Sequence, residues 1–140
     1  KKKGVILLAS HINQVEHLLQ NLQPAVREQI IETWTNRTLN DRATTWLLPA
    51  DEHIPTWIKG DHPKVAVRVT THPLCVALCN AFNGFIVSTS ANPAGLEPAR
   101  SLQDANQYFN FEINYLNGDL GLGTEPSKIL DAESGNIIRA

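Results

Sequence analysis

Short apolar runs alternate along this chain with longer stretches in which apolar residues recur every three or four positions. The short runs predict β-strands at residues 5–9, 44–50, 65–69, 127–131 and 136–139, another that begins at Phe85, and a short one within 109–116. The helical spacing predicts helices over residues 11–21, 25–34, 74–81 and 102–108, with a short one over 54–58. We therefore expect an α/β fold, a twisted mixed β-sheet with packed helices.

Helix boundaries are indicated by residues with known end preferences. Ser10 and Ser101 are expected as N-caps, because a serine hydroxyl accepts a hydrogen bond from a free N–H of the first turn. Pro24 and Pro73 suit first-turn positions, where no N–H is needed. The polar stretch at residues 35–42 has no periodicity and predicts a loop. In the helix over 74–81, the residues expected to face inward are Leu74, Ala77 and Leu78.

The stretch Phe-Ile-Val-Ser-Thr-Ser-Ala-Asn-Pro at residues 85–93 is the first candidate for a site. Its apolar start predicts a buried strand, and the proline at its end stops regular pairing. Ser88, Ser90 and Asn92 are then expected at or just past the strand end, with the two serines on one face. Ligands bind beyond the carboxyl ends of strands in α/β sheets, and these groups can donate hydrogen bonds to a phosphate or carboxylate. The alternative is an ordinary strand followed by a polar turn.

Arg68 is a second candidate, because it lies in an alternating strand on the face opposite Val67 and Val69. A guanidinium among β-branched residues needs an anionic partner, either a ligand phosphate or a carboxylate. The alternative is an arginine on a solvated face of the sheet. The residues alone leave both interpretations open.

Composition and charge narrow the function classes. With 140 residues, 42% hydrophobic and 19% charged, the chain suits a single packed domain over residues 1–140. The formal net charge of -2 provides no global basic field, so nucleic-acid contact would need a local patch. No apolar run reaches membrane-spanning length, and a solvated end is expected for the basic start at residues 1–3. Cys75 and Cys79 are expected to be buried thiols in a reducing cytoplasm.

The full set of candidate site residues contains hydroxyls, one amide and one guanidinium: Thr45, Arg68, Ser88, Ser90, Asn92 and Ser127. None is an obvious nucleophile with a base beside it, and no metal-ligand spacing occurs, so we expect no protein-bound metal. Such groups orient and neutralise phosphates. They suit nucleotidyl chemistry in which ATP and its metal carry the reactivity.

Three segments carry a resemblance to a known family. Ser-Thr-Ser-Ala-Asn at residues 88–92 resembles the Ser-x-Asn signature of YrdC-like proteins. Val-Arg-Val-Thr-Thr-His-Pro at residues 67–73 is similar to the family's Val-Arg-x-x-x-His-Pro segment, and Pro-Ser-Lys-Ile-Leu-Asp at residues 126–131 is similar to its Pro-Ser-x-Ile-x-Asp segment. The segments occur in the family's order and cover the chain from about Lys3 onward. The resemblance therefore implies a YrdC-like domain.

The resemblance also implies an activity. Family members are L-threonylcarbamoyl-adenylate synthases, which join L-threonine, bicarbonate and ATP with Mg²⁺ and release pyrophosphate. The product serves threonylcarbamoyladenosine modification of tRNA next to the anticodon, so tRNA or tRNA-modification proteins are expected partners and the cytoplasm is the expected location. The resemblance implies catalytic roles for Ser90 and Asn92 and nucleotide contacts from Thr45, Arg68, Ser88 and Ser127.

The chain departs from the family pattern in several places. The family's Pro-Gly-Pro after the tryptophan is missing beyond Trp34, where a longer polar run stands, and Ala94 replaces a usual serine. The Pro-Thr-Glu-Ala-like segment and the Lys-x-Arg motif do not occur, and Lys3 aligns after them. We therefore expect an N-terminally truncated domain, less active than a version extended at its N-terminus.

Two other functions stay open at this stage. One is a non-catalytic RNA- or nucleotide-binding module of the same fold. The other is a carbamoyl-transfer domain of the hydrogenase-maturation type, which would be marked by a linked zinc-finger and acylphosphatase-like region; the sequence contains neither.

Overall fold

The structure is a computed structural model that describes residues 5–38 and 40–140. These residues form two compact units, which are described separately below. The larger unit comprises Val5–Ser88 and Gly121–Ala140, and the smaller contains Thr89–Leu120. A single domain over residues 1–140 stays a prediction, and the expected solvated start at residues 1–3 lies outside the described residues.

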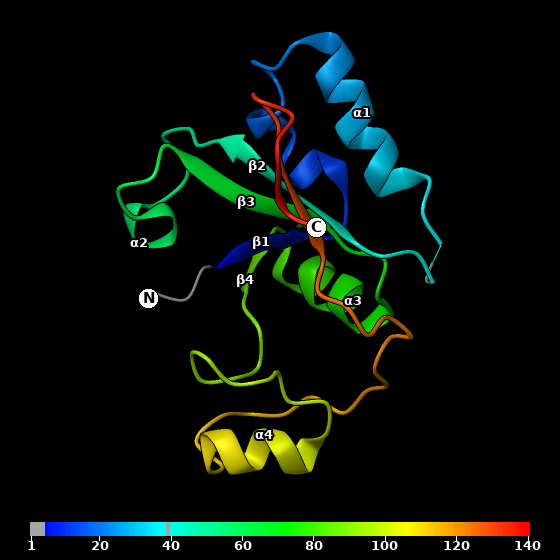
Figure 1. Cartoon of the computed structure of the whole chain (residues 1–140), viewed down its shortest axis with the longest axis vertical. Helices are drawn as coiled ribbons and strands as arrows, with labels where there is room; N and C mark the ends of the chain where they lie inside the picture. The colour runs from blue at the N-terminus through cyan, green and yellow to red at the C-terminus, as the bar shows by residue number, and fades with distance from the viewer. Residues whose placement is uncertain (1–4, 39) are drawn as a thin grey trace. The chain divides into compact units, whose positions relative to one another are not determined.

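A six-stranded sheet organises the larger unit, with the strand order β4-β1-β3-β2-β5-β6 (Figure 1). The strands are β1 (Ile6–Ala9), β2 (Thr44–Pro49), β3 (Lys64–Val69), β4 (Ile86–Ser88), β5 (Lys128–Asp131) and β6 (Ile137–Arg139). The pairs β1–β3 and β2–β5 are parallel, and the other pairs are antiparallel. The predicted α/β fold with a mixed sheet is therefore confirmed.

Helices connect these strands within the larger unit. They are α1 (Pro24–Thr35), α2 (Thr56–Lys59) and α3 (Pro73–Phe82), preceded by two 3₁₀ turns, η1 (Ile12–Gln14) and η2 (Glu16–Leu18). Pro24 and Pro73 occupy the first turns of α1 and α3, as expected. Asn83 ends α3 in the left-handed conformation, with φ of 59°.

The hydrophobic core lies on one face of the sheet. Alternate residues of three strands point into it, because successive side chains of a strand face opposite sides. They pack against Ile30 and Trp34 of α1 and against residues of the 3₁₀ turns, and the buried set includes Leu7, Ala9, Val15, Leu18, Leu19, Trp46, Leu48, Val65, Val67 and Val69. Two indole N–H groups fasten α1 to β2: Trp34 Nε1 donates to the carbonyl of Thr44 at 3.0 Å, and Trp46 Nε1 donates to Thr33 Oγ1 at 2.9 Å.

The other face of the sheet carries the polar candidates and meets α3. Leu8 lies on this face, one position from the core residue Leu7, and is 3% exposed. The Cys79 thiol of α3 donates to the Leu8 carbonyl at 3.3 Å, which fixes the helix against β1. Arg68 pairs in register with Leu8 and therefore shares its face. The alternation of residues 65–69 is thus confirmed.

Two elements differ from the sequence-based expectations. Residues 11–21 do not form an α-helix but the two 3₁₀ turns, and His11 rather than Ser10 stands at the start of the first. Val15, with φ of -125°, interrupts the helical path while its side chain is fully buried. Within 109–116 no strand forms, because Asn110 and Phe111 both have positive φ, which breaks extended pairing.

Burial also differs from expectation at α3 and β4. Leu78 is 44% exposed and Ala77 is exposed, so their expected inward orientation was wrong, while Leu74 is half-buried and Cys79 is the buried residue of α3. Among the described residues, β4 is an edge strand that pairs only with β1, and Val87 is 43% exposed; the expectation of a buried strand was wrong. The reason is that an apolar run alone does not distinguish a central strand from an edge strand.

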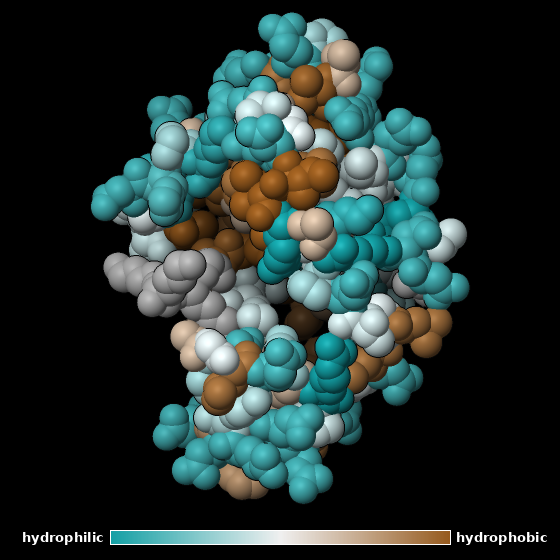
Figure 2. All heavy atoms as spheres, viewed as in Figure 1, coloured by the Kyte–Doolittle hydropathy of each residue, from teal (hydrophilic) through white to brown (hydrophobic). Residues whose placement is uncertain are grey.

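The opposite edge strand, β6, is also apolar and exposed. Ile137 and Ile138 are 66% and 57% exposed, and Figure 2 shows apolar side chains at the surface where Figure 1 draws the C-terminal segment. Within the part of the chain that the structure describes, β6 pairs with β5 alone, and the register shifts between Ile129 and Leu130. The strand is short, which limits the unpaired backbone that this edge presents.

The smaller unit is built around α4 (Leu102–Phe109). Ser101 Oγ accepts the Asp104 backbone N–H at 3.0 Å, so the predicted cap is confirmed. The loop before α4 is closed by a hydrogen bond from the Ala99 N–H to the Ala91 carbonyl at 2.8 Å. The Tyr108 hydroxyl donates to the Glu97 carbonyl at 3.0 Å, which ties the helix to this loop.

Candidate functional site

The sheet places one row of candidate residues across the larger unit. Leu8 of β1 pairs with Arg68 of β3, and Thr45 of β2 pairs with Ile129 of β5. One position beyond the Trp46–Val67 pair, the same antiparallel register sets Thr45 opposite Arg68. Directly opposite residues share a face. Arg68 and Thr45 therefore lie side by side on the face that α3 meets.

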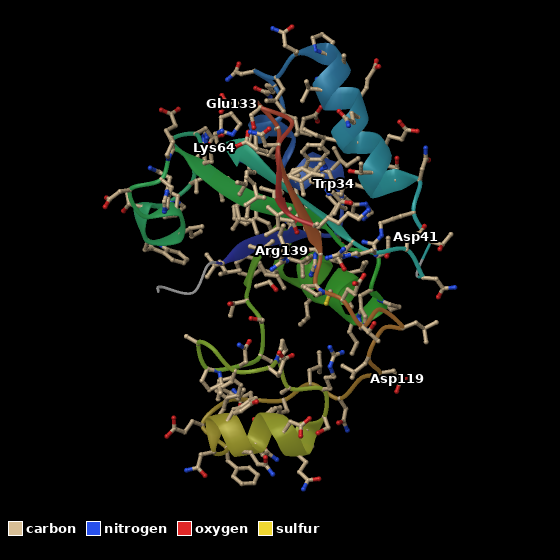
Figure 3. All side chains as sticks on the ribbon, viewed as in Figure 1. Trp34, Asp41, Lys64, Asp119, Glu133 and Arg139 are labelled. Atoms are coloured by element: carbon tan, nitrogen blue, oxygen red, sulfur yellow. The ribbon has the colours of Figure 1, made fainter. Side chains whose placement is uncertain are left out.

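A hydrogen-bond chain that is buried at Thr45 and Ser127 continues this row. Thr45 Oγ1 and Ser127 Oγ lie 2.8 Å apart, and the two residues are 0% and 5% exposed. Arg139, labelled in Figure 3, donates from Nη2 to the same Ser127 oxygen at 3.1 Å and from Nε to the Ser127 carbonyl at 2.9 Å. The structure thus brings together Thr45 and Ser127, two of the residues selected from the sequence, and joins them to a guanidinium.

Arg68 is the half-buried cation of this face. Its Nε is buried and has no hydrogen-bond partner, and among the described residues Arg68 forms no salt bridge. Burial lowers the pKa of Arg68, and the positive charges of Arg37 and Arg139 lower it further, while the nearby Cys75 acts in the opposite direction. No carboxylate contributes to that pKa shift. Arg68 is therefore a desolvated cation whose charged neighbours are other arginines, which favours an anionic ligand.

Ser88, Ser90 and Asn92 occupy a different part of the chain. Ser88 is the last residue of β4 in the larger unit, while Ser90 and Asn92 belong to the smaller unit. The Asn92 amide nitrogen donates to the carbonyls of Pro93 and Leu96 at 3.0 and 2.7 Å, so this side chain shapes its own loop. The expected shared face of the two serines does not arise as a strand feature, because β4 ends at Ser88. Their roles stay predictions.

Arg139 was not selected from the sequence, although the signal was present. It is a lone charged residue beside the apolar residues Ile137 and Ile138 of a predicted strand, and Arg68 likewise stands among apolar residues of a strand. What the sequence did not reveal is that β6 pairs with β5, which brings Arg139 to Ser127. Arg37 also escaped selection, because it stands in the aperiodic polar stretch after α1.

Other candidate chemistry is limited in the part of the chain that the structure describes. Cys75 is half-buried and Cys79 is buried, both are free thiols, and burial raises the pKa of each. The expectation of a buried thiol is confirmed for Cys79 only.

Over residues 5–38 and 40–140, no cluster of three or more histidine, cysteine or acidic side chains could hold a metal ion. Within the same residues, every helix is too short or too polar to cross a membrane.

Comparison with known proteins assigns the chain to a protein family. A family model named for Sua5, YciO and YrdC, and described as telomere recombination, matches residues 1–140. A threonylcarbamoyl-AMP synthase of Acinetobacter baumannii is 69% identical over 138 residues, covering 99% of this chain and 73% of that protein. One of Acinetobacter baylyi is 64% identical over 139 residues, covering 99% of this chain and 72% of that protein.

Solved structures agree on the fold. Sua5 of P. abyssi, complexed with L-threonine, superposes with a TM-score of 0.77 at 22% identity, covering 92% of this chain and 36% of that one. The MTH1692 protein of Methanobacterium thermoautotrophicum gives a TM-score of 0.66 at 23% identity, covering 93% of this chain and 58% of that one. Both likenesses concern the fold alone. With the family match over all 140 residues and relatives at 69% and 64% identity, the chain belongs to the Sua5/YciO/YrdC family.

Proposed function

We propose that this chain catalyses the formation of L-threonylcarbamoyl-AMP from L-threonine, bicarbonate and ATP, which makes it a nucleotidyltransferase. The observation that carries the proposal is the polar row on the α3 face of the sheet. Thr45 and Ser127 share a hydrogen bond of 2.8 Å, Arg139 donates to Ser127, and Arg68 has a buried Nε without a partner. The Acinetobacter relatives, at 69% and 64% identity, carry the name of this activity.

The reaction has two steps. The threonine amine attacks the carbon of bicarbonate, and loss of water leaves a carbamate. A carbamate oxygen then attacks the α-phosphorus of ATP, the bond to the bridging oxygen breaks, and pyrophosphate leaves. Both steps hold anions together, so positioned cations and neutral donors lower the barrier. Arg68 and Arg139 supply cations for the phosphates, and the hydroxyl of Thr45 or Ser127 orients a phosphate oxygen.

Ser88, Ser90 and Asn92 are further proposed nucleotide contacts, with Ser90 and Asn92 as the catalytic pair. Their support is the match of residues 88–92 to the Ser-x-Asn signature of the family. ATP enters with Mg²⁺, which neutralises part of the triphosphate charge. L-Threonine as the amino-acid substrate agrees with the P. abyssi Sua5 structure, which is complexed with L-threonine. The product serves threonylcarbamoyladenosine modification of tRNA next to the anticodon, in the cytoplasm, with tRNA or tRNA-modification proteins as partners.

The test is to measure pyrophosphate release by the chain in the presence of ATP and Mg²⁺ and to detect the threonylcarbamoyl-AMP product by mass spectrometry. We expect release that requires both L-threonine and bicarbonate, so omission of either substrate is the control. Binding of ATP without any substrate-dependent release would instead support a non-catalytic nucleotide-binding module, and binding of RNA alone would support an RNA-binding one.

A further inference from the structure

Arg37 is held in place by contacts within its own loop. It directly follows the C-cap of α1, Asn36, and its Nη2 donates to the Asp41 carbonyl at 3.2 Å. The same turn is closed by the Thr38 N–H, which donates to Asp41 Oδ2 at 2.6 Å, and by the Asp41 N–H, which donates to the Thr38 carbonyl at 3.2 Å. The guanidinium of Arg37 is therefore positioned by a backbone contact and not by a carboxylate.

One hydrogen-bond donor of Arg37 has no partner. Its Nε is buried without a hydrogen bond, as is the Nε of Arg68. Buried N–H donors are normally satisfied, so each of these two Nε groups is suited to an acceptor oxygen of a bound anion. The charge of Arg37 is also among the groups that depress the pKa of Arg68, which places the two cations within electrostatic reach of each other.

Arg42 shows what a structural arginine in this loop looks like. Its Nε donates to the Pro126 carbonyl at 2.7 Å, its Nη2 donates to the Ala140 carbonyl at 2.7 Å, and its Nη1 lies 3.7 Å from Glu125 Oε2. These contacts join the loop to the residues next to Ser127 and Arg139 in the chain, and so bring it to the polar row. Arg37, with its single backbone contact and its orphan Nε, has no comparable structural role among the described residues.

We propose that Arg37 is a third phosphate-binding guanidinium of the site, beside Arg68 and Arg139, and that it holds the pyrophosphate part of ATP. The proposal rests on the proposed function. Three guanidiniums without a carboxylate partner among the described residues need more negative charge than a single carboxylate or bicarbonate provides. A diphosphate group supplies several acceptor oxygens and more than one charge. Arg37 stands in the polar run that takes the place of the family's Pro-Gly-Pro.

Calorimetric titration of the whole chain with inorganic pyrophosphate, and separately with L-threonine, tests the assignment. We expect Arg37→Gln to weaken pyrophosphate affinity by about tenfold or more, the effect of losing hydrogen bonds to a charged group, and to leave threonine affinity unchanged. Arg37→Lys keeps the positive charge but loses the planar guanidinium with its several donors. Its pyrophosphate affinity should therefore lie between those of the unmodified protein and Arg37→Gln. Arg27→Gln is the matched control, because Arg27 is paired with Glu16 on exposed surface.

Several results would overturn the assignment. These are equal pyrophosphate affinity in the unmodified protein and in folded Arg37→Gln, no pyrophosphate binding by the unmodified protein, or a selective loss of threonine affinity. If Arg37→Gln does not fold, Arg37→Lys is compared with the unmodified protein at raised salt, where charge is screened. Equal pyrophosphate affinity of these two proteins would also contradict the assignment. The readout is binding, so it is separate from the proposed function, which fails if ATP, threonine and bicarbonate yield no threonylcarbamoyl-AMP.

Discussion

The hydroxyl oxygens of Thr45 and Ser127 lie 2.8 Å apart in the protein interior, although 82 residues separate them in the chain. Thr45 is the second residue of β2 and Ser127 directly precedes β5, so the parallel pairing of these strands makes the contact. Arg139 Nη2 also donates to Ser127 Oγ at 3.1 Å. Ser127 is therefore the centre of the polar row, with partners on both sides.

This geometry predicts unequal effects of removing the two hydroxyls. Ser127→Ala leaves Thr45 Oγ1 and Arg139 Nη2 without their partner, so it should lower the free energy of unfolding by about 1–3 kcal/mol. Thr45→Val keeps the Ser127–Arg139 bond and should cost less. Urea unfolding measures both. An equal or larger loss in Thr45→Val would contradict the central position of Ser127.

Arg68→Ala should weaken ATP binding by about 1.5–3 kcal/mol, the range for a hydrogen bond to a charged group. The thermal stability of the protein should be almost unchanged, because Arg68 forms no salt bridge within the described residues that the substitution could remove. Titration of ATP into the folded variant measures the first effect, and Arg27→Ala is the control. Unaltered ATP affinity in folded Arg68→Ala would remove Arg68 from the site.

The acid stability of the protein should depend on Asp131. Its Oδ2 accepts a hydrogen bond from Lys64 Nζ at 2.6 Å, and Figure 3 shows Lys64 near Glu133, whose Oε2 is 2.8 Å from the same nitrogen. The Lys64 hydrogen bond is the main cause that lowers the pKa of Asp131, and the N–H groups of Ser134 and Glu133 lower it further against the effect of burial.

Because the folded-state pKa of Asp131 is depressed, its stabilisation is present above the unfolded pKa of about 3.9 and is lost as pH falls through the folded value. Asp131→Asn should therefore be less stable at neutral pH and lose less of its melting temperature than the unmodified protein on acidification below about pH 4. Melting curves across this range measure it, with exposed Asp61→Asn as the control. Parallel acid profiles of the unmodified protein and Asp131→Asn would refute the role.

In the smaller unit, Ser101→Ala should destabilise α4 by about 0.5–2 kcal/mol, because the Asp104 N–H loses its acceptor. Hydrogen exchange of the α4 amides should become faster by the corresponding factor, while the α1 amides in the same sample serve as an internal control. Unchanged exchange in α4 would mean that the cap contributes nothing to the helix.

Local patterns in the sequence determined much of the fold. The strands β1, β2, β3, β5 and β6 and the helices α1, α3 and α4 occur where apolar spacing and end residues indicated them, because these signals act over a few neighbouring positions. Failures arose where burial competes with local preference. Val15 is fully buried at the cost of the helical path, and Val87 lies on an edge strand although its run is apolar.

The sequence by itself also selected Arg68 through strand alternation and a family-like segment, Ser127 through another such segment, and Thr45 as the match to a family threonine. Only the tertiary structure decided that β2 pairs with β5 and β5 with β6, and this pairing brings Arg139 to Ser127. Strand partners are chosen by packing and hydrogen bonding between distant segments, which periodicity does not encode. The same reason explains Arg37, which stands in a loop without a sequence pattern. It becomes a candidate phosphate-binding residue only because the folded chain buries its Nε and brings its charge close enough to lower the pKa of Arg68.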